Sequence, residues 1–167
     1  MTMTTRSLLL ASLLVSPLLL TACKKEAPVA DQAAEAKVLV APAKDDDAGW
    51  KAYLPAVVQE NMGTITNSPF LYYLPPESDP EFAAKFERQV EAASLAMSRG
   101  VQKGNLLAFG SPASAKMAEL IETAFKEVPA DTMEGVRILF IGEVADNARV
   151  QAALAPTGAE YVFVEAK

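Results

Sequence analysis

Few residues in this chain could do chemistry, because it contains no histidine and only one cysteine, Cys23. The lack of histidine excludes Ser-His-Asp and Cys-His catalysis, HExxH zinc sites and histidine-ligated haem. A single cysteine leaves no pair for a disulfide or a zinc-thiolate site. Serine, tyrosine, lysine, arginine and carboxylate side chains remain as candidates, and we expect no cofactor and no metal.

The loop Gly110–Ser114 follows an apolar run and precedes a helical pattern. Backbone N–H groups at a helix start, together with the hydroxyls of Ser111 and Ser114, can hold an anion. The loop has neither the phosphate-loop spacing nor the dinucleotide fingerprint, so the simpler interpretation is that Ser111 caps the helix. Ser111 could also be a nucleophile with Lys116 as its base, although no G-x-S-x-G motif supports that role.

Two carboxylates, Glu143 and Asp146, follow the apolar run Val136–Ile141. Such a pair can act as acid and base or bind a metal ion, but it also fits a polar loop in which Asp146 caps the next helix. If the apolar runs are parallel strands, these loops meet at the carboxyl ends of the strands, where open sheets bind ligands. The predicted site for a small anionic ligand consists of Ser111, Ser114, Glu143 and Asp146.

The elements that position these loops alternate along the chain. Apolar runs predict strands, and spacings of three and four residues predict amphipathic helices between them. Nearly continuous apolar runs are typical of parallel strands covered on both faces, so we expect an α/β three-layer sandwich with a mainly parallel sheet and helices on both faces. Strands are expected at Phe70–Leu74, Leu106–Phe109, Val136–Ile141 and Tyr161–Val164, and helices at Trp50–Met62, Phe82–Met97, Met117–Phe125 and Val150–Leu154.

Local signals refine these elements. The acids Asp45–Asp47 are expected to cap the first helix, and Pro55 is expected to kink or split it. The run Phe70–Leu74 is fenced by prolines and predicts a buried strand in which successive tyrosines point to opposite sides. Ser78 or Asp79 is expected to cap the second helix. The sheet has four strands, or five if Val38–Val40 adds an edge strand.

Composition limits the classes of protein to which the chain can belong. Its 167 residues, of which 51% are hydrophobic, suit one α/β domain over 45–167 together with a shorter N-terminal region. The formal net charge is −6 and no long basic run occurs, so nucleic acid is not expected as a partner.

The N-terminal region has the organisation of a secretory signal. Arg6 precedes the apolar stretch Leu8–Leu20, which has 13 residues. A helix of that length spans about 20 Å, which is short of the hydrocarbon core of about 30 Å. The stretch therefore predicts a signal-peptide core over 1–22 and not a transmembrane helix.

The signal ends in Leu20-Thr21-Ala22-Cys23, which resembles the lipobox of bacterial lipoproteins at all four positions. The resemblance implies cleavage before Cys23, a thioether-linked diacylglycerol on its sulfur and acylation of the new amino group. Two or three acyl chains attach a protein to a membrane stably, whereas one does so only marginally. In the same family, Lys24 after the cysteine favours the outer membrane, facing the periplasm, while Lys25 leaves the inner membrane as the alternative.

A flexible tether is expected over 23–44, which is rich in alanine, proline, lysine and acids. Such a coil would hold the domain on the order of 25 Å from the membrane, and up to about 70 Å when extended. Without a catalytic signature, we expect a lipid-anchored interaction or assembly module with an envelope protein partner, and lean against an enzyme. The alternative is a small anionic-ligand-binding protein, or an enzyme-derived fold, with its site at the strand ends.

The lipid anchor gives a direct prediction. Replacement of Cys23 by serine or alanine removes the sulfur that takes the diacylglyceryl group, so the variant should lose both its lipid and its membrane attachment. Metabolic labelling with a radioactive fatty acid, followed by membrane fractionation, measures both properties. A wild-type chain that takes up no label would contradict the anchor.

Overall fold

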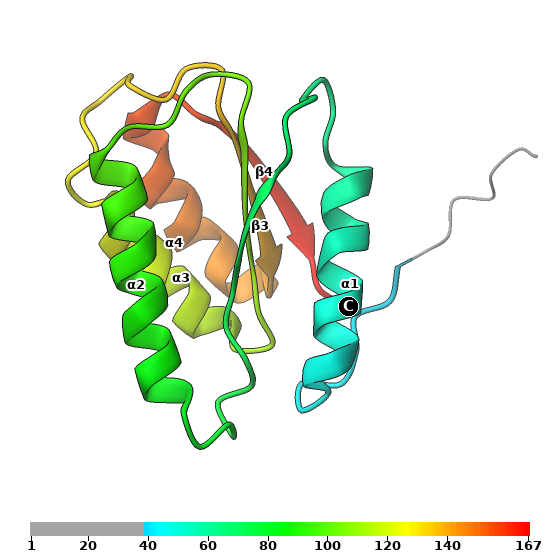
Figure 1. The fold of residues 1–167 in the computed structure, drawn as a ribbon. Helices are drawn as coiled ribbons and strands as arrows, with labels where there is room; N and C mark the ends of the chain where they lie inside the picture. Colours follow the sequence, from blue (N-terminus) through cyan, green and yellow to red (C-terminus); the bar gives the residue numbers. More distant parts are fainter. Residues whose placement is uncertain (1–38) are drawn as a thin grey trace, which may run out of the picture. The chain divides into compact units, whose positions relative to one another are not determined.

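The computed structural model describes residues 39–167 (Figure 1). The predicted signal peptide, Cys23 and the tether up to Val38 lie outside these residues. Among residues 39–167, no helix is both long enough and apolar enough to cross a membrane. In chain order the elements are α1 Asp47–Glu60, β1 Phe70–Tyr73, α2 Phe82–Ser98, β2 Leu106–Gly110, α3 Ser114–Phe125, β3 Arg137–Gly142, α4 Val144–Leu154, the short 3-10 helix η1 Ala155–Thr157 and β4 Glu160–Glu165.

All four strands are parallel, and their order in the sheet is the order in the chain, β1-β2-β3-β4. Right-handed crossovers between neighbouring parallel strands bring every connecting helix to the same face. Helices α2, α3 and α4 accordingly lie on one side of the sheet, and α1 lies on the other (Figure 1). The predicted α/β three-layer sandwich with a parallel sheet and helices on both faces is confirmed.

The core consists of two apolar layers, one on each face of the sheet. Side chains alternate along the central strands, so Leu107 and Phe109 of β2 pack toward α2, α3 and α4, whereas Leu106 and Ala108 pack toward α1. The aromatic rings of Tyr72 and Phe109 stack at 4.7 Å between centroids. Burial of both faces by apolar side chains is the main favourable contribution to the stability of this sheet.

One of the two helix caps predicted for α1 and α2 is confirmed. The Asp46 carboxylate accepts a hydrogen bond from the Gly49 N–H at 2.8 Å and caps α1, as predicted. The prediction that Ser78 or Asp79 caps α2 is wrong, because the cap position is Glu81; the Asp79 carboxylate accepts from the Glu81 N–H at 2.8 Å in the turn before the helix. Helix α1 continues past Pro55 without a break, so the predicted split does not occur.

Two expectations about the sheet edges need correction. The run Phe70–Leu74 was expected to form a buried strand, but β1 is an edge strand, and Phe70 and Leu71 are 54% and 38% exposed. An edge strand has a neighbour on one side only, so the layers above and below it end there. Residues Leu39 and Val40 form no strand, and the described residues contain a four-stranded sheet.

The domain also begins before Asp45, although the tether was expected to extend to Lys44. Leu39 and Ala41 pack against the apolar layer beneath α1, and the Ala41 N–H donates to the Lys167 carbonyl at 2.9 Å. The Trp50 indole N–H donates to the Ala43 carbonyl at 3.1 Å. These contacts hold the segment against the domain.

The contact between α1 and the sheet gives a second prediction. A Cβ atom at Gly110 would lie 2.4 Å from Cδ2 of Leu54, which is fully buried. Gly110→Ala should therefore lower the free energy of unfolding by about 1–3 kcal/mol through overpacking, and Leu54→Ala by about 2–5 kcal/mol through a cavity. In the double variant the new methyl group enters the space left by Leu54, so the loss should be smaller than the sum. Additive losses in denaturant unfolding would contradict the direct contact.

Candidate functional site

The carboxyl ends of the strands lie together, as predicted, and two shallow depressions open there. The larger has a volume of about 350 Å³ and lies between the loops that follow β1, β2 and β3. The smaller, of about 220 Å³, lies beside it toward the C-terminal residues. Ser114 and Glu143 line both depressions, whereas Ser111 lines only the smaller one.

Ser111 links the end of β1 to the end of β2. The residue is 1% exposed. Its hydroxyl donates to the Leu74 carbonyl at 2.9 Å and accepts from the Ala113 N–H at 2.8 Å. Ala113 occupies the cap position of α3, so Ser111 is not the helix cap that the sequence suggested. Because its hydroxyl bonds to two backbone groups, we interpret Ser111 as structural.

Ser114 links the end of β2 to the end of β3. Its hydroxyl donates to Oδ2 of Asp146 at 2.6 Å and accepts from the Glu143 N–H at 2.8 Å. Gly142 permits this approach, because a Cβ atom there would lie 2.6 Å from the Ser114 hydroxyl oxygen. The structure thus brings three predicted site residues into one hydrogen-bonded group.

Asp146 has a different role from the predicted helix cap. The cap position of α4 is Glu143, whose extended backbone precedes the first turn, and Asp146 lies inside that turn. A carboxylate in the first turn is stabilised by the helix dipole. Asp146 is 7% exposed, and its charge is met by the Ser114 hydroxyl and by the Arg149 guanidinium at 3.6 Å.

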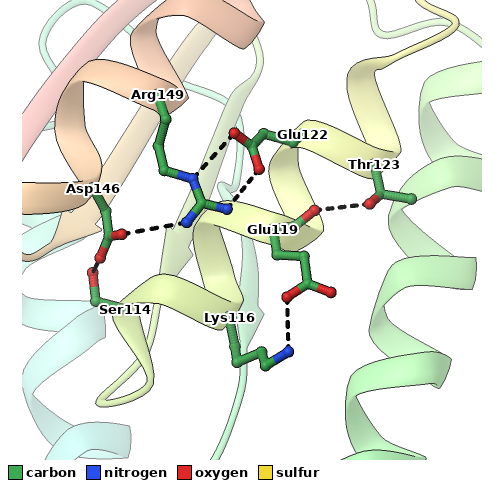
Figure 2. Close-up of polar contacts among 7 residues, drawn as sticks. All are labelled: Ser114, Lys116, Glu119, Glu122, Thr123, Asp146 and Arg149. Atoms are coloured by element: carbon green, nitrogen blue, oxygen red, sulfur yellow. Dashed lines mark hydrogen bonds and ion pairs between the residues drawn. The ribbon is translucent and has the colours of Figure 1, made fainter.

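Figure 2 shows how this group continues between the two helices: the Arg149 guanidinium lies between Asp146 and Glu122. Arg149 donates two hydrogen bonds to the Glu122 carboxylate, at 2.6 and 3.1 Å. The hydrogen bonds from Arg149 lower the pKa of Glu122. The spacing of these residues in the sequence gives no signal for the pair, because it joins α3 to α4 across the fold.

Lys44 is a second residue of the site that the sequence did not indicate. Its ammonium group pairs with the Glu143 carboxylate beside both depressions. The hydrogen bond to Glu143 raises the pKa of Lys44, and the negative charge of Asp146 adds to the effect. Lys44 was assigned to the tether, where a lysine has no expected partner.

The charges around the larger depression do not favour the predicted anionic ligand. Its lining contains three carboxylates, on Asp45, Glu77 and Glu143, and a single cation, Lys44. The two serine hydroxyls, which were expected to bind the anion, already donate to acceptors within the protein. The arrangement therefore fits a structural junction of three strand ends better than an anion site.

The predicted nucleophile and base are also engaged elsewhere. Lys116 pairs with Glu119 on its own helix at 2.8 Å and lies over the ring of Phe86 at 5.4 Å. Burial raises the pKa of the tyrosines, which therefore stay protonated at neutral pH. Within residues 39–167, no lysine is hydrogen-bonded to Ser111.

Comparisons with known protein families, curated proteins and solved structures found no match to this chain.

The structural role of the serines can be tested by mutation. Ser111→Ala leaves a buried donor and a buried acceptor without their partner, and Ser114→Ala does the same to the part-buried Glu143 N–H and to Oδ2 of Asp146. Each variant should therefore lower the free energy of unfolding by about 1–3 kcal/mol. Ser98→Ala is the matched control, because Ser98 is exposed and bonds only within its own helix; it should change stability by less than about 0.5 kcal/mol. Denaturant unfolding measures all three. Unchanged stability in both buried variants would restore the ligand-binding interpretation.

Proposed function

We propose that the chain is a lipid-anchored bacterial envelope protein whose α/β domain is a non-enzymatic interaction or assembly module. The anchor is the acylated Cys23, and Lys24 directs the protein to the outer membrane, where it faces the periplasm. The lipobox supports the attachment. The partner is another component of the envelope, within reach of the tether.

The main support for the interaction role is that the polar groups at the strand ends form hydrogen bonds within the protein itself. In an active site, catalytic groups are exposed to the substrate and have perturbed pKa values. Here the hydroxyls of Ser111 and Ser114 and the carboxylate of Asp146 bond to one another or to the backbone. Within residues 39–167, every buried side-chain nitrogen or oxygen has a hydrogen-bond partner.

The surface of the domain supplies the second argument. Five large apolar side chains are well exposed among residues 39–167. Exposed apolar residues that persist on an acidic, soluble surface are typical of contacts with other proteins. They are Val40 at 69%, Val144 at 59%, Phe70 at 54%, Leu95 at 49% and Leu71 at 38% exposure.

Chemical crosslinking in living cells tests the proposal. Wild-type protein should fractionate with the outer membrane and give a defined adduct with an envelope protein, identified by mass spectrometry. The Cys23→Ala variant serves as the control: it should leave the membrane, and its adduct should weaken because the effective concentration near the membrane is lost. A wild-type protein that gives no adduct, or a soluble enzyme activity that needs no partner, would contradict the interaction role.

A further inference from the structure

The outer edge of β1 is open in the sheet. Within the described sheet, β1 pairs with β2 alone, so the backbone groups on its other side have no strand beside them. Phe70 and Leu71 lie on this strand with 54% and 38% of their surfaces exposed. Successive side chains point to opposite faces, so apolar surface flanks the open edge on both sides. This combination is a template for strand addition.

A depression with mostly charged walls lies at the carboxyl end of the same strand. It has a volume of about 290 Å³ and is lined by Tyr73 and Pro75, together with Asp79 and polar or charged side chains from α1 and α2. Two lysines in its wall are already neutralised by neighbouring carboxylates. The ion pairs are Lys51 with Asp47 at 2.6 Å, and Lys85 with Asp79 at 2.7 Å and with Glu81 at 3.4 Å.

Arg88 is the remaining charge in this wall. It is exposed on α2, and no carboxylate of residues 39–167 lies within ion-pair distance of it. Arg88 is therefore the one charged group in this wall without an ion-pair partner among the described residues. An arginine fork binds a carboxylate through two parallel hydrogen bonds.

We propose that the edge of β1 accepts an extended segment of the partner protein as a fifth strand, and that a carboxylate of this segment binds Arg88. The inference rests on the proposed function, because it names the surface through which the interaction module acts. Pro69 and Pro75 limit the strand to a few residues, so backbone hydrogen bonds alone would hold the segment weakly. The carboxylate contact adds affinity and selects acidic segments.

The other edge of the sheet does not offer the same chemistry. Strand β4 begins at Glu160 and ends at Glu165, which pair with Arg137 at 2.6 Å and with Lys167 at 3.0 Å. These two cations beside β4 are therefore already bound to carboxylates, whereas Arg88 beside β1 has no such partner among residues 39–167. The β1 edge is therefore the edge that offers a cation to the proposed partner.

Site-specific photocrosslinking in living cells distinguishes this surface from the others. A photoreactive amino acid replaces Phe70, Leu95 or Val144, one at a time, in the full-length chain. All three are exposed apolar residues, but only Phe70 lies on β1. We expect the partner adduct from position 70 and not from the other two. An adduct from position 95 or 144 alone would overturn the edge proposal and retain the interaction module, whereas no adduct from any position would overturn both.

Charge reversal then tests the role of Arg88. Arg88→Glu should lower the yield of the adduct from position 70 about tenfold, since it replaces a charge-assisted contact by repulsion, and Arg88→Lys should restore part of it. Arg99→Glu is the matched control, because Arg99 is an exposed arginine at the end of the same helix; it should leave the yield unchanged. Thermal unfolding of each variant checks that the fold is kept.

The crosslinked segment of the partner gives the last readout. It should contain an aspartate or glutamate within a few residues of the attachment point, and replacement of that acid should lower the yield as Arg88→Glu does. An adduct with lipid would show that the edge faces the membrane and would overturn the proposal. A protein adduct whose yield is the same in wild type and Arg88→Glu would also overturn it.

Discussion

The rest of the structure depends on the burial of the two central strands, β2 and β3, on both faces. Every residue of β2 and all but the first of β3 are buried, so both sides of the sheet need apolar cover. Right-handed crossovers bring α2, α3 and α4 to one side. The opposite face is left to α1, which precedes the first strand and is free of that constraint.

One helix cannot cover four strands, and this determines which apolar side chains stay exposed. A helix with its side chains is about 10 Å wide, whereas neighbouring strands are about 4.8 Å apart, so α1 covers the two central strands. Its Leu54 side chain fills the space above Gly110 of β2. On the outer strands, Leu71 is exposed and Val162 is only partly buried. Because α1 is wide enough for the central strands alone, apolar side chains on the outer strands stay exposed or only partly buried.

The types and order of the elements could be predicted because they depend on local patterns, such as the apolar run of β3 or the Asp46 cap. The position of a strand in the sheet could not: Phe70–Tyr73 has the composition of a central strand but lies at an edge. The strand-end loops were predicted to meet, yet the partners of their hydroxyls lie 37 and 32 residues away in the chain, at Leu74 and Asp146. Such contacts are set by packing, and no spacing in the sequence records them.

The two edges of the sheet differ in how the charges beside them are paired, and the difference argues that they have different roles. At β4, Glu160 and Glu165 pair with Arg137 and Lys167, so no cation of these pairs is left for a partner. Strand β1 itself carries no acidic residue, and prolines stop it from extending. A short strand of this kind resists open-ended aggregation while it keeps an apolar edge next to an arginine without a carboxylate partner among the described residues. An acidic segment that pairs with this edge would therefore meet an arginine that no carboxylate of the described residues neutralises.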